Sequence, residues 1–205
     1  MCAIAFPETL VVAGRTDGLT QFDDIETDGG WGEVPSNYGS LHFEGFYVFK
    51  PTDPEIGRVI SENDLNCATS KPNALYGTRF NFEDEPKLPF ISAAAPFSQD
   101  DKMTVGSMTG GSSEPPTLFE LESLKVKALD MPFAYTTLSL PLEWAVDFPA
   151  GFHDMFKVDI EAFSGRKWSN LTKLEIWADF HDDSNGIVLD WEYCFDDLRV
   201  RFDVG

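Results

Sequence analysis

The sequence lacks any long apolar segment and is poor in basic residues. No apolar run approaches the roughly 18 residues that cross a bilayer, so we predict a soluble protein with no membrane partner. Fifteen lysines and arginines stand against 35 aspartates and glutamates, for a formal net charge of −20. This charge repels phosphate backbones and predicts no nucleic-acid partner. Dense surface carboxylate also suits cation binding, although solubility alone explains it more simply.

Cysteine is scarce as well. The chain has three cysteines, Cys2, Cys67 and Cys194, and no two of them form a C-x-x-C pair. This number excludes a disulfide scaffold, and the spacing does not indicate a zinc site. We therefore expect reduced, buried thiols, and whether Cys67 and Cys194 form a disulfide stays open.

The N-terminal stretch "MCAIAFPETLVVAG" does not match a secretory signal. It has no basic residue at its start, and Pro7 and Glu8 interrupt its apolar run. We expect a cytoplasmic protein if this N-terminus is native, and a secreted one if a leader was removed. The glycosylation sequon Asn170-Leu171-Thr172 would matter only in the second case.

The usual catalytic motifs are missing. The sequence contains no G-x-S-x-G, H-E-x-x-H or P-loop motif, and no G-x-G-x-x-G that opens a helix. Of the three histidines, only His42 is placed to face a sheet surface, and a structural role is the simpler interpretation. Carboxylate pairs are too numerous to identify a glycosidase, although Glu175, near Trp177, would be the first choice.

Turn residues and short β-type runs are abundant. Glycine, proline and asparagine recur at short intervals, and the runs between them are rich in β-branched and aromatic residues. This pattern is typical of an all-β sandwich or barrel, here one domain over residues 1–205. The clearest predicted strands are Leu19–Ile25, Ser40–Lys50, Ala74–Phe82, Lys102–Met108, Thr117–Leu129, Phe156–Phe163, Leu171–Phe180 and Leu189–Phe202.

The alternation of residue types along these runs singles out aromatic surfaces. Phe156–Phe163 alternates cleanly between apolar and charged residues, as a half-buried strand does. Trp177 lies on the polar side of its run, and Leu41–Phe49 and Trp191–Phe195 carry aromatics on both faces. We expect these rings either to form a ligand platform or to be covered by long loops. The segment Met131–Gly151 is either a pair of strands with a loop or a cover over such a cleft.

The last run, "YCFDDLRVRF", raises a question of its own. If it is a regular strand, Cys194, Asp196 and Leu198 share one face, and Asp196 points at the core. A buried carboxylate must be neutralised, hydrogen-bonded or bound to a metal. Asp24 shares parity with the apolar Phe22 near the start of the chain. If the first and last strands pair, Asp24 and Asp196 would converge on one structural calcium ion.

Three sequence blocks carry a resemblance that covers most of the chain. They are "FDDI" followed by "VPSNYGSLHFEGFYVF", then "TLFELESLKVKAL", and finally "CFDDLRV". In order and spacing they resemble a group of fungal jelly-roll proteins related to carbohydrate-binding modules and galactose-binding folds. The resemblance implies a jelly-roll β-sandwich of two antiparallel sheets. Some members of that group are implicated in cyclisation, including hetero-Diels–Alder couplings in specialised metabolism.

Two functions follow as expectations. The first is a cyclase without a catalytic cofactor, which would hold a hydrophobic or aromatic small molecule in an aromatic-lined cleft through shape, desolvation and hydrogen bonds. Its catalytic residues would be His42, Tyr47, Arg79 and Trp177.

The second function is a carbohydrate-binding module with structural calcium. Its sugar-stacking rings would be Trp31, Tyr38, Trp177 or Tyr193, whereas we assign substrate binding in the cyclase to Trp31, Tyr38, Glu175, Trp191 and Tyr193. The absence of a leader and the eighteen phenylalanines favour the cyclase. A jelly roll without a ligand, and a homodimer across a sheet edge, both stay open.

Overall fold

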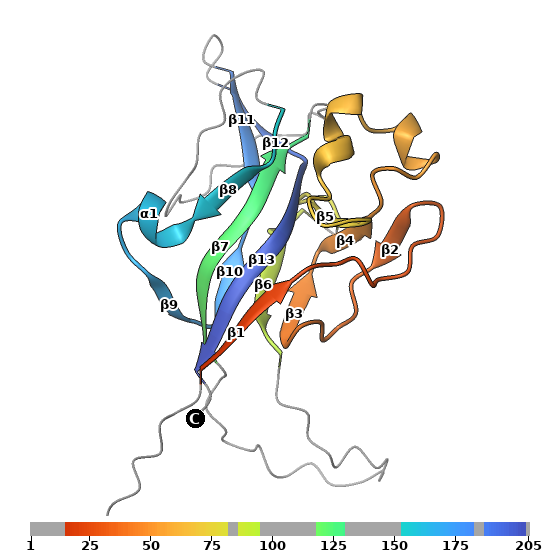
Figure 1. Cartoon of the computed structure of the whole chain (residues 1–205). Coiled ribbons are helices and arrows are strands. Elements are labelled where there is room, and N and C mark those ends of the chain that lie inside the picture. The colour runs from red at the N-terminus through yellow and green to blue at the C-terminus, as the bar shows by residue number, and fades with distance from the viewer. Residues whose placement is uncertain (1–14, 82–85, 95–117, 130–152, 183–186, 204–205) are drawn as a thin grey trace, which may run out of the picture.

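The computed structural model describes residues 15–81, 86–94, 118–129, 153–182 and 187–203 (Figure 1). Strands dominate this part of the chain, and every strand pairing is antiparallel. The predicted strand Lys102–Met108 and the candidate cover Met131–Gly151 lie outside the described residues.

The larger sheet runs through the centre of the molecule. β13 (Tyr193–Asp203) and β7 (Phe119–Ala128) are its long middle strands. One side of the pair carries β5, β4 and β2, and the other carries β8; β1 pairs with the second half of β13, and β9 pairs with β7. The bounds of these strands are β1 Arg15–Thr20, β2 Trp31–Glu33, β4 Phe46–Phe49, β5 Ala74–Gly77, β8 Phe156–Asp159 and β9 Trp168–Leu171.

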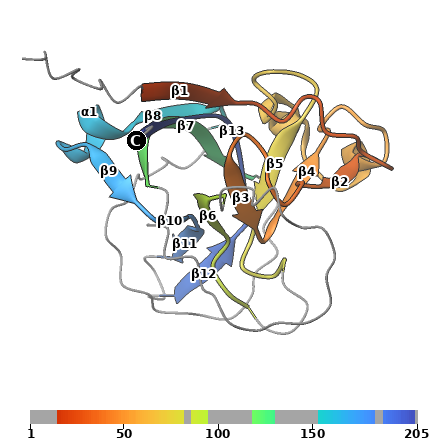
Figure 2. The same ribbon diagram turned by 90° about the horizontal axis from the view of Figure 1, so that it is seen from below.

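A smaller sheet faces the larger one. It consists of β10 (Lys173–Glu175), β6 (Phe90–Ala93) and β3 (Leu41–Glu44), and it lies beneath the larger sheet in Figure 2. A hairpin of β11 (Ala178–Asp182) and β12 (Ile187–Trp191) lies beside it. The predicted all-β architecture of two antiparallel sheets is therefore confirmed. The main core cluster holds Phe22, Leu41, Phe43, Phe46, Val48, Leu75, Ile91, Phe119, Leu121, Leu124, Val158, Ile160, Leu174, Tyr193, Phe195, Leu198 and Val200.

The first and last described strands pair, which is the condition that the calcium hypothesis requires. β1 runs antiparallel to the second half of β13, with Leu19 opposite Arg199 and Thr20 opposite Leu198. The predicted strand Leu19–Ile25 is nevertheless misplaced, because β1 ends at Thr20 and a turn follows. Asp24 therefore lies in a turn and not on a strand face.

The predicted strand Ser40–Lys50 is in fact two strands in different sheets. Gly45, with φ of 76°, separates β3 from β4. Glycine adopts this left-handed conformation at little cost, so the chain can turn out of the smaller sheet and enter the larger one. Aromatic residues on both faces of this run are explained by this change of sheet.

β13 carries a bulge that corrects the predicted alternation. Its register with β7 shifts between Asp196 and Arg199, and Asp197 has a left-handed φ of 51°. A bulge adds one residue to a strand and reverses the side-chain parity beyond it. Tyr193 and Phe195 before the bulge, and Leu198 and Val200 after it, all face the main core. Regular alternation predicted that Cys194 and Asp196 share a face with Leu198, Val200 and Phe202. This prediction is wrong, because the bulge places Cys194 and Asp196 on the opposite face.

The predicted strand Phe156–Phe163 also ends early. β8 stops at Asp159, and a short helix, α1, follows over Ile160–Ser164. The Asp159 carboxylate accepts a hydrogen bond from the Ala162 amide at 3.1 Å and caps the helix. Gly165 ends the helix in the left-handed conformation. The local capping signals thus outweigh the strand-type alternation.

A second apolar cluster covers the outer face of the larger sheet. We call residues 51–73 the cover segment; it contains two 3-10 helices, η1 (Ile56–Arg58) and η2 (Glu62–Asn66). Its apolar side chains pack against residues that β4, β5 and β13 direct away from the main core. This second cluster holds Phe49, Ile56, Cys67, Ala68, Ala74, Leu129 and Cys194. The central strands are thus buried on both faces at this end of the sheet.

Candidate ligand-binding surface

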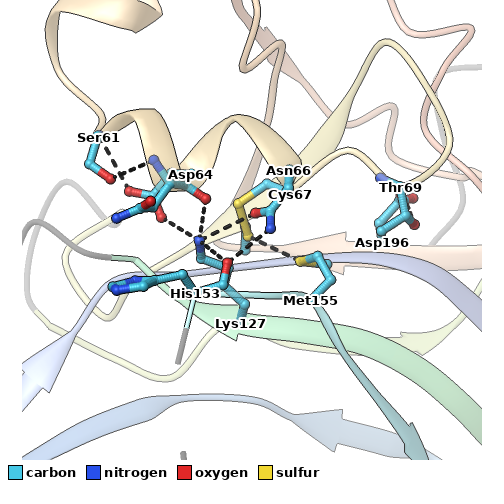
Figure 3. Close-up of a disulfide and its surroundings, with 11 residues drawn as sticks. Ser61, Asp64, Asn66, Cys67, Thr69, Lys127, His153, Met155 and Asp196 are labelled. Atoms are coloured by element: carbon cyan, nitrogen blue, oxygen red, sulfur yellow. Dashed lines mark hydrogen bonds and ion pairs between the residues drawn. A yellow bond between two sulfur atoms is a disulfide. The ribbon is translucent and has the colours of Figure 1, made fainter. Parts of the chain in front are cut away.

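A disulfide attaches the cover segment to the sheet. Cys67, at the end of η2, is bonded to Cys194 of β13 with a sulfur–sulfur distance of 2.03 Å (Figure 3). The expectation of reduced thiols is therefore wrong for this pair. The bulge at Asp197 is the physical reason, because Cys194 faces the cover segment while Leu198 faces the main core.

A buried ion pair forms a second attachment. The Lys127 ammonium on β7 lies 2.9 Å from the Asp64 carboxylate of η2, and both side chains are buried. The same ammonium donates to the backbone oxygens of Asn63 at 2.6 Å and His153 at 2.9 Å. Figure 3 shows Asp64 and His153 beside the Lys127 nitrogen, next to the disulfide. A buried charge needs such partners, because an isolated one would cost several kcal/mol.

Asp196 forms the third attachment, and its contacts answer the question that its burial raises. Its side chain accepts hydrogen bonds from the Thr69 amide at 2.8 Å, the Ser70 amide at 3.0 Å and the Asp197 amide at 2.7 Å. The Ser70 hydroxyl also donates to it at 3.0 Å, whereas the Thr69 hydroxyl, 3.0 Å away, has one proton and lies closer to the Asp197 carboxylate. Burial raises the pKa of the Asp196 carboxyl, and the hydrogen bonds from Asp197 and Ser70 oppose this rise. The carboxylate thus fixes the end of the cover segment.

These contacts satisfy the buried Asp196 carboxylate without a cation, because three amide hydrogens point at it. The exposed Asp24 instead accepts a hydrogen bond from the Tyr38 hydroxyl. Within the described residues, no group of three or more His, Cys, Asp or Glu side chains could hold a metal ion. Calcium shared by Asp24 and Asp196 stays a prediction.

Asp197 links the bulge to neighbouring segments. Its carboxylate lies 2.7 Å from the Lys125 ammonium and accepts hydrogen bonds from Gln21 Nε2 and Thr69 Oγ1, each at 2.8 Å. Desolvation raises the pKa of Asp197, but the hydrogen bonds from Lys125, Gln21 and Thr69 outweigh it and hold the pKa below its ordinary value. This aspartate is therefore ionised and paired in the folded protein at neutral pH.

An exposed aromatic surface lies next to the cover segment. We call Trp31, Tyr47 and Tyr76 the aromatic patch; they come from β2, β4 and β5, three neighbouring strands. Tyr47 lies directly opposite Tyr76 in the ladder, and the Trp31 and Tyr76 ring centroids are 5.2 Å apart in an edge-to-face contact. Trp31 and Tyr47 each keep 37% of their surface exposed. Large rings that share one sheet face and stay exposed can stack on a flat ligand.

Packing beneath the aromatic patch holds it in place. The buried ring of Phe49 stacks on Trp31, with centroids 5.8 Å apart and an angle of 30° between the planes. Gly30, directly before Trp31, has a φ of 83°, and a Cβ there would lie 2.3 Å from the Ile56 side chain of the cover segment. This close approach requires glycine. The cover segment therefore supports the strand that presents Trp31.

A carboxylate lies within the same surface. Glu33 is opposite Tyr47 in the β2–β4 ladder and is exposed. Residues that are opposite each other in a ladder share a face, so Glu33 adds a hydrogen-bond acceptor beside the rings. The surface thus combines flat apolar rings with one polar group.

The structure does not bring the four predicted catalytic residues together. His42 lies on β3 in the smaller sheet, where its ring contacts the Ser36 backbone oxygen at 2.9 Å and Glu44 at 3.4 Å. Arg79 is almost completely buried, with 1% of its surface exposed. Trp177 lies half-buried between β10 and β11, and Tyr47 is in the aromatic patch. The predicted position of His42 on a sheet surface is confirmed.

The predicted substrate-binding residues also lie in different parts of the fold. Only Trp31 lies in the aromatic patch. Tyr193 is buried in the core, and its hydroxyl donates to the Ile176 backbone oxygen at 2.7 Å. The Trp191 indole donates to the Leu129 backbone oxygen at 2.7 Å, and Glu175 lies 2.6 Å from the Lys173 ammonium.

Tyr38 has a structural role as well. Its ring stacks on Phe22, with centroids 5.7 Å apart, and its single hydroxyl proton is shared between the Asp24 carboxylate and the Gln21 backbone oxygen. Burial raises the pKa of Tyr38, and the hydrogen bond with Asp24 adds to the rise. The hydroxyl therefore stays protonated and holds the turn after β1.

Tyr76 is the residue that sequence reasoning missed. It lies within the predicted strand Ala74–Phe82 and alternates with Leu75, whose side chain faces the main core. This alternation already places Tyr76 on the outer face. Only the strand order, with β5 next to β4, shows that it adjoins Tyr47.

A polar groove of about 310 Å³ lies on the outer face of the larger sheet, over β7, β8 and β13. Arg201 forms ion pairs with Glu120 and Glu122 inside it. Four acidic and four basic side chains therefore balance each other, which is typical of a solvated, salt-bridged sheet face. Its lining residues are Glu120, Leu121, Glu122, Ser123, Lys157, Asp159, Glu161, Lys167, Arg199 and Arg201.

Comparisons with known proteins add no relative to this description. In the part of the chain that the structure covers, no helix is long and apolar enough to pass through a membrane. No protein-family model, curated protein or solved structure matches the chain.

Proposed function

We propose that this protein is a non-catalytic, carbohydrate-binding β-sandwich of the jelly-roll type, which stacks sugar rings on the aromatic patch. The observation that carries the proposal is the exposure of Trp31 and Tyr47 on one face of three neighbouring strands, beside Tyr76. Sugar rings present flat C–H surfaces, and exposed aromatic rings on a sheet are suited to bind them. Glu33 supplies an acceptor for a sugar hydroxyl.

The disulfide supports a secreted location for this function. Disulfides form and persist in oxidising compartments and are rare in the cytosol. The Cys67–Cys194 bond therefore favours the secreted alternative over the cytoplasmic one. A polysaccharide-binding protein also finds its ligands outside the cell. The secreted location is therefore consistent with sugar binding at the aromatic patch.

The charge of the chain narrows the ligand class. A formal net charge of −20 repels polyanions, so uronic-acid and sulfated polysaccharides are poor ligands. Neutral glycans such as cellulose, chitin or β-1,3-glucan are the expected class. Binding should be measured to these three insoluble polysaccharides, with soluble polygalacturonate as the acidic comparison.

The decisive variant is Trp31→Ala. Loss of the exposed ring should weaken binding to the preferred neutral glycan at least about fivefold, since removal of one central aromatic contact typically costs more than about 1 kcal/mol. Binding isotherms from depletion assays measure this change. Phe163→Ala is the matched control, because Phe163 of α1 is 49% exposed and lies outside the patch.

Two results would contradict the proposal. One is that the protein binds none of the neutral glycans, and the other is that Trp31→Ala and Phe163→Ala bind as the unchanged protein does. Thermal unfolding of both variants separates lost binding from lost folding, because Trp31 also packs on Phe49.

The cyclase expectation stays a prediction with less support. Its mechanism needs donors that converge on an apolar hollow closed to water. Among the described residues, His42, Tyr47, Arg79 and Trp177 lie on different surfaces or in the interior. The disulfide also weakens the argument from a missing leader, which favoured the cyclase over a glycan reader.

A further inference from the structure

We propose that Asn170 carries an N-linked glycan that covers the open edge of β9. Asn170-Leu171-Thr172 is the one N-x-S/T sequon in the chain, and its middle residue is not proline. Asn170 and Thr172 are both exposed. The proposal does not rest on the aromatic patch; it shares with it only the secreted location.

The local backbone presents the Asn170 side chain to solvent. Asn170 has a left-handed φ of 59°, a conformation that asparagine tolerates better than most residues. No hydrogen bond to its side-chain amide is present among the described residues, so the amide nitrogen is available. Leu171 instead packs against the main core, which fixes the strand beneath the sequon.

A glycan at Asn170 would protect the unpaired edge of β9. β9 pairs with β7 through Leu171 opposite Phe119 and Trp168 opposite Leu121, and no described strand pairs with its other edge. An open strand edge is a template for pairing with another chain, and proteins protect such edges. A bulky, hydrated glycan at Asn170 blocks this pairing. It would therefore exclude a homodimer through this edge.

The modification leaves the proposed glycan-binding surface free. The aromatic patch begins on β2, at one border of the larger sheet, and β9 lies at the opposite border. Figures 1 and 2 both place β9 and β2 on opposite sides of the molecule. The covalent glycan is thus separated from the surface that would bind a glycan.

The chemical step is a glycosyl transfer from a lipid-linked oligosaccharide diphosphate, catalysed by the transferase of the secretory pathway. The Asn170 Nδ2 atom forms a bond to the anomeric carbon of the first sugar, and the bond from that carbon to the diphosphate oxygen breaks. Nδ2 loses one proton, and the lipid diphosphate leaves with the electron pair. No oxidation or reduction takes place, and Thr172 supplies the hydroxyl that the transferase requires.

The test uses the full chain secreted by a eukaryotic host behind a cleavable leader. Intact mass before and after peptide-N-glycosidase should differ by one N-glycan, and peptide mapping should find aspartate at position 170 after the digestion. Asn170→Asp and Thr172→Ala should both abolish the glycan. Thr172→Ser should retain it, because the sequon accepts serine.

Asn170→Asp should fold as the unchanged protein does. Aspartate tolerates the left-handed conformation at position 170 nearly as well as asparagine, so Asn170→Asp should be secreted in similar amounts. A secreted protein with unmodified Asn170 would overturn the proposal. A glycan that persists in both Asn170→Asp and Thr172→Ala would overturn it as well.

The outcome is independent of the proposed function. The enzymatically deglycosylated protein should bind neutral polysaccharide as well as the glycosylated form does. Loss of the glycan in Thr172→Ala together with intact polysaccharide binding separates the two proposals.

Discussion

Replacement of Asp196 tests why a carboxylate is buried beside the cover segment. In the folded protein it accepts hydrogen bonds from four donors of Thr69, Ser70 and Asp197, three of them backbone amides. In Asp196→Ala the hydroxyl can turn toward another acceptor, whereas the amides are fixed by the backbone. Each buried amide without an acceptor costs about 1–3 kcal/mol.

The expected loss follows from these contacts. The carboxylate is completely buried, and water that enters the space left by the side chain can satisfy part of the amides. We therefore expect Asp196→Ala to lower the free energy of unfolding by about 3 kcal/mol, within the range for a broken buried network. In a domain of this size such a loss lowers Tm by about 6–12 °C. Asp196→Asn should lose less, because its amide oxygen still accepts.

The assay is thermal unfolding in excess calcium and in excess chelator. If hydrogen bonds to Thr69 and Ser70 explain the burial, Asp196→Ala destabilises the protein equally in both solutions. A structural calcium ion predicts a larger loss in calcium than in chelator, because the variant removes a ligand. Asp24→Asn is the matched control, since it alters the second predicted ligand and leaves the carboxylate of Asp196 in place.

A clear result would refute this account of Asp196. If Asp196→Ala and Asp24→Asn lose stability only in calcium, and neither differs from the unchanged protein in chelator, the metal explanation is correct. If Asp196→Ala changes the free energy of unfolding by less than about 1 kcal/mol in both solutions, neither the hydrogen bonds to Asp196 nor a calcium ion stabilises the fold.

Two further predictions concern the same end of the sheet. Replacing both bonded cysteines, Cys67→Ala with Cys194→Ala, should cost about 4–5 kcal/mol, because the bond closes a loop across 127 residues; denaturant unfolding measures this, and native protein in which both thiols react with a labelling reagent would contradict it. Asp197→Asn should remove a pH-dependent part of the stability. Since the pKa of Asp197 is lowered in the folded protein, its contribution is present above the unfolded value of about 3.9 and is lost as the pH falls through the folded pKa. The two proteins should therefore converge in stability in acid, and a constant difference across the pH range would refute this.

Sequence reasoning predicted the fold class and the pairing of the termini. Regular alternation and turn residues indicate strands, and Leu19 does lie opposite Arg199. The internal register of the last strand was not predictable, because nothing in "FDDL" marks Asp197 as left-handed in the way that a glycine would. The bulge at Asp197 was not recognised from the sequence, so Cys194 and Asp196 were predicted on the face that Leu198 occupies. For this reason the disulfide between Cys194 and Cys67 was not predicted either.

The candidate surface was predictable only in part. Trp31 was predicted to bind substrate and Tyr47 to act in catalysis, and both lie in the aromatic patch. Their proximity depends on the path of the chain at Gly45, where one predicted strand becomes two in different sheets. Tyr38 and Tyr193 looked equally suitable in the sequence, but their hydroxyls bind the backbone oxygens of Gln21 and Ile176.

The attachment of the cover segment to β13 has a consequence for the order in which the chain matures. Residues 51–73 leave the ribosome early, but two of their three anchors, Cys194 and Asp196, are on the last described strand. During synthesis this segment must wait, unanchored, until more than a hundred further residues have followed it. A nascent chain stalled before residue 194 should therefore present Cys67 as an accessible thiol to the oxidation machinery and to chaperones.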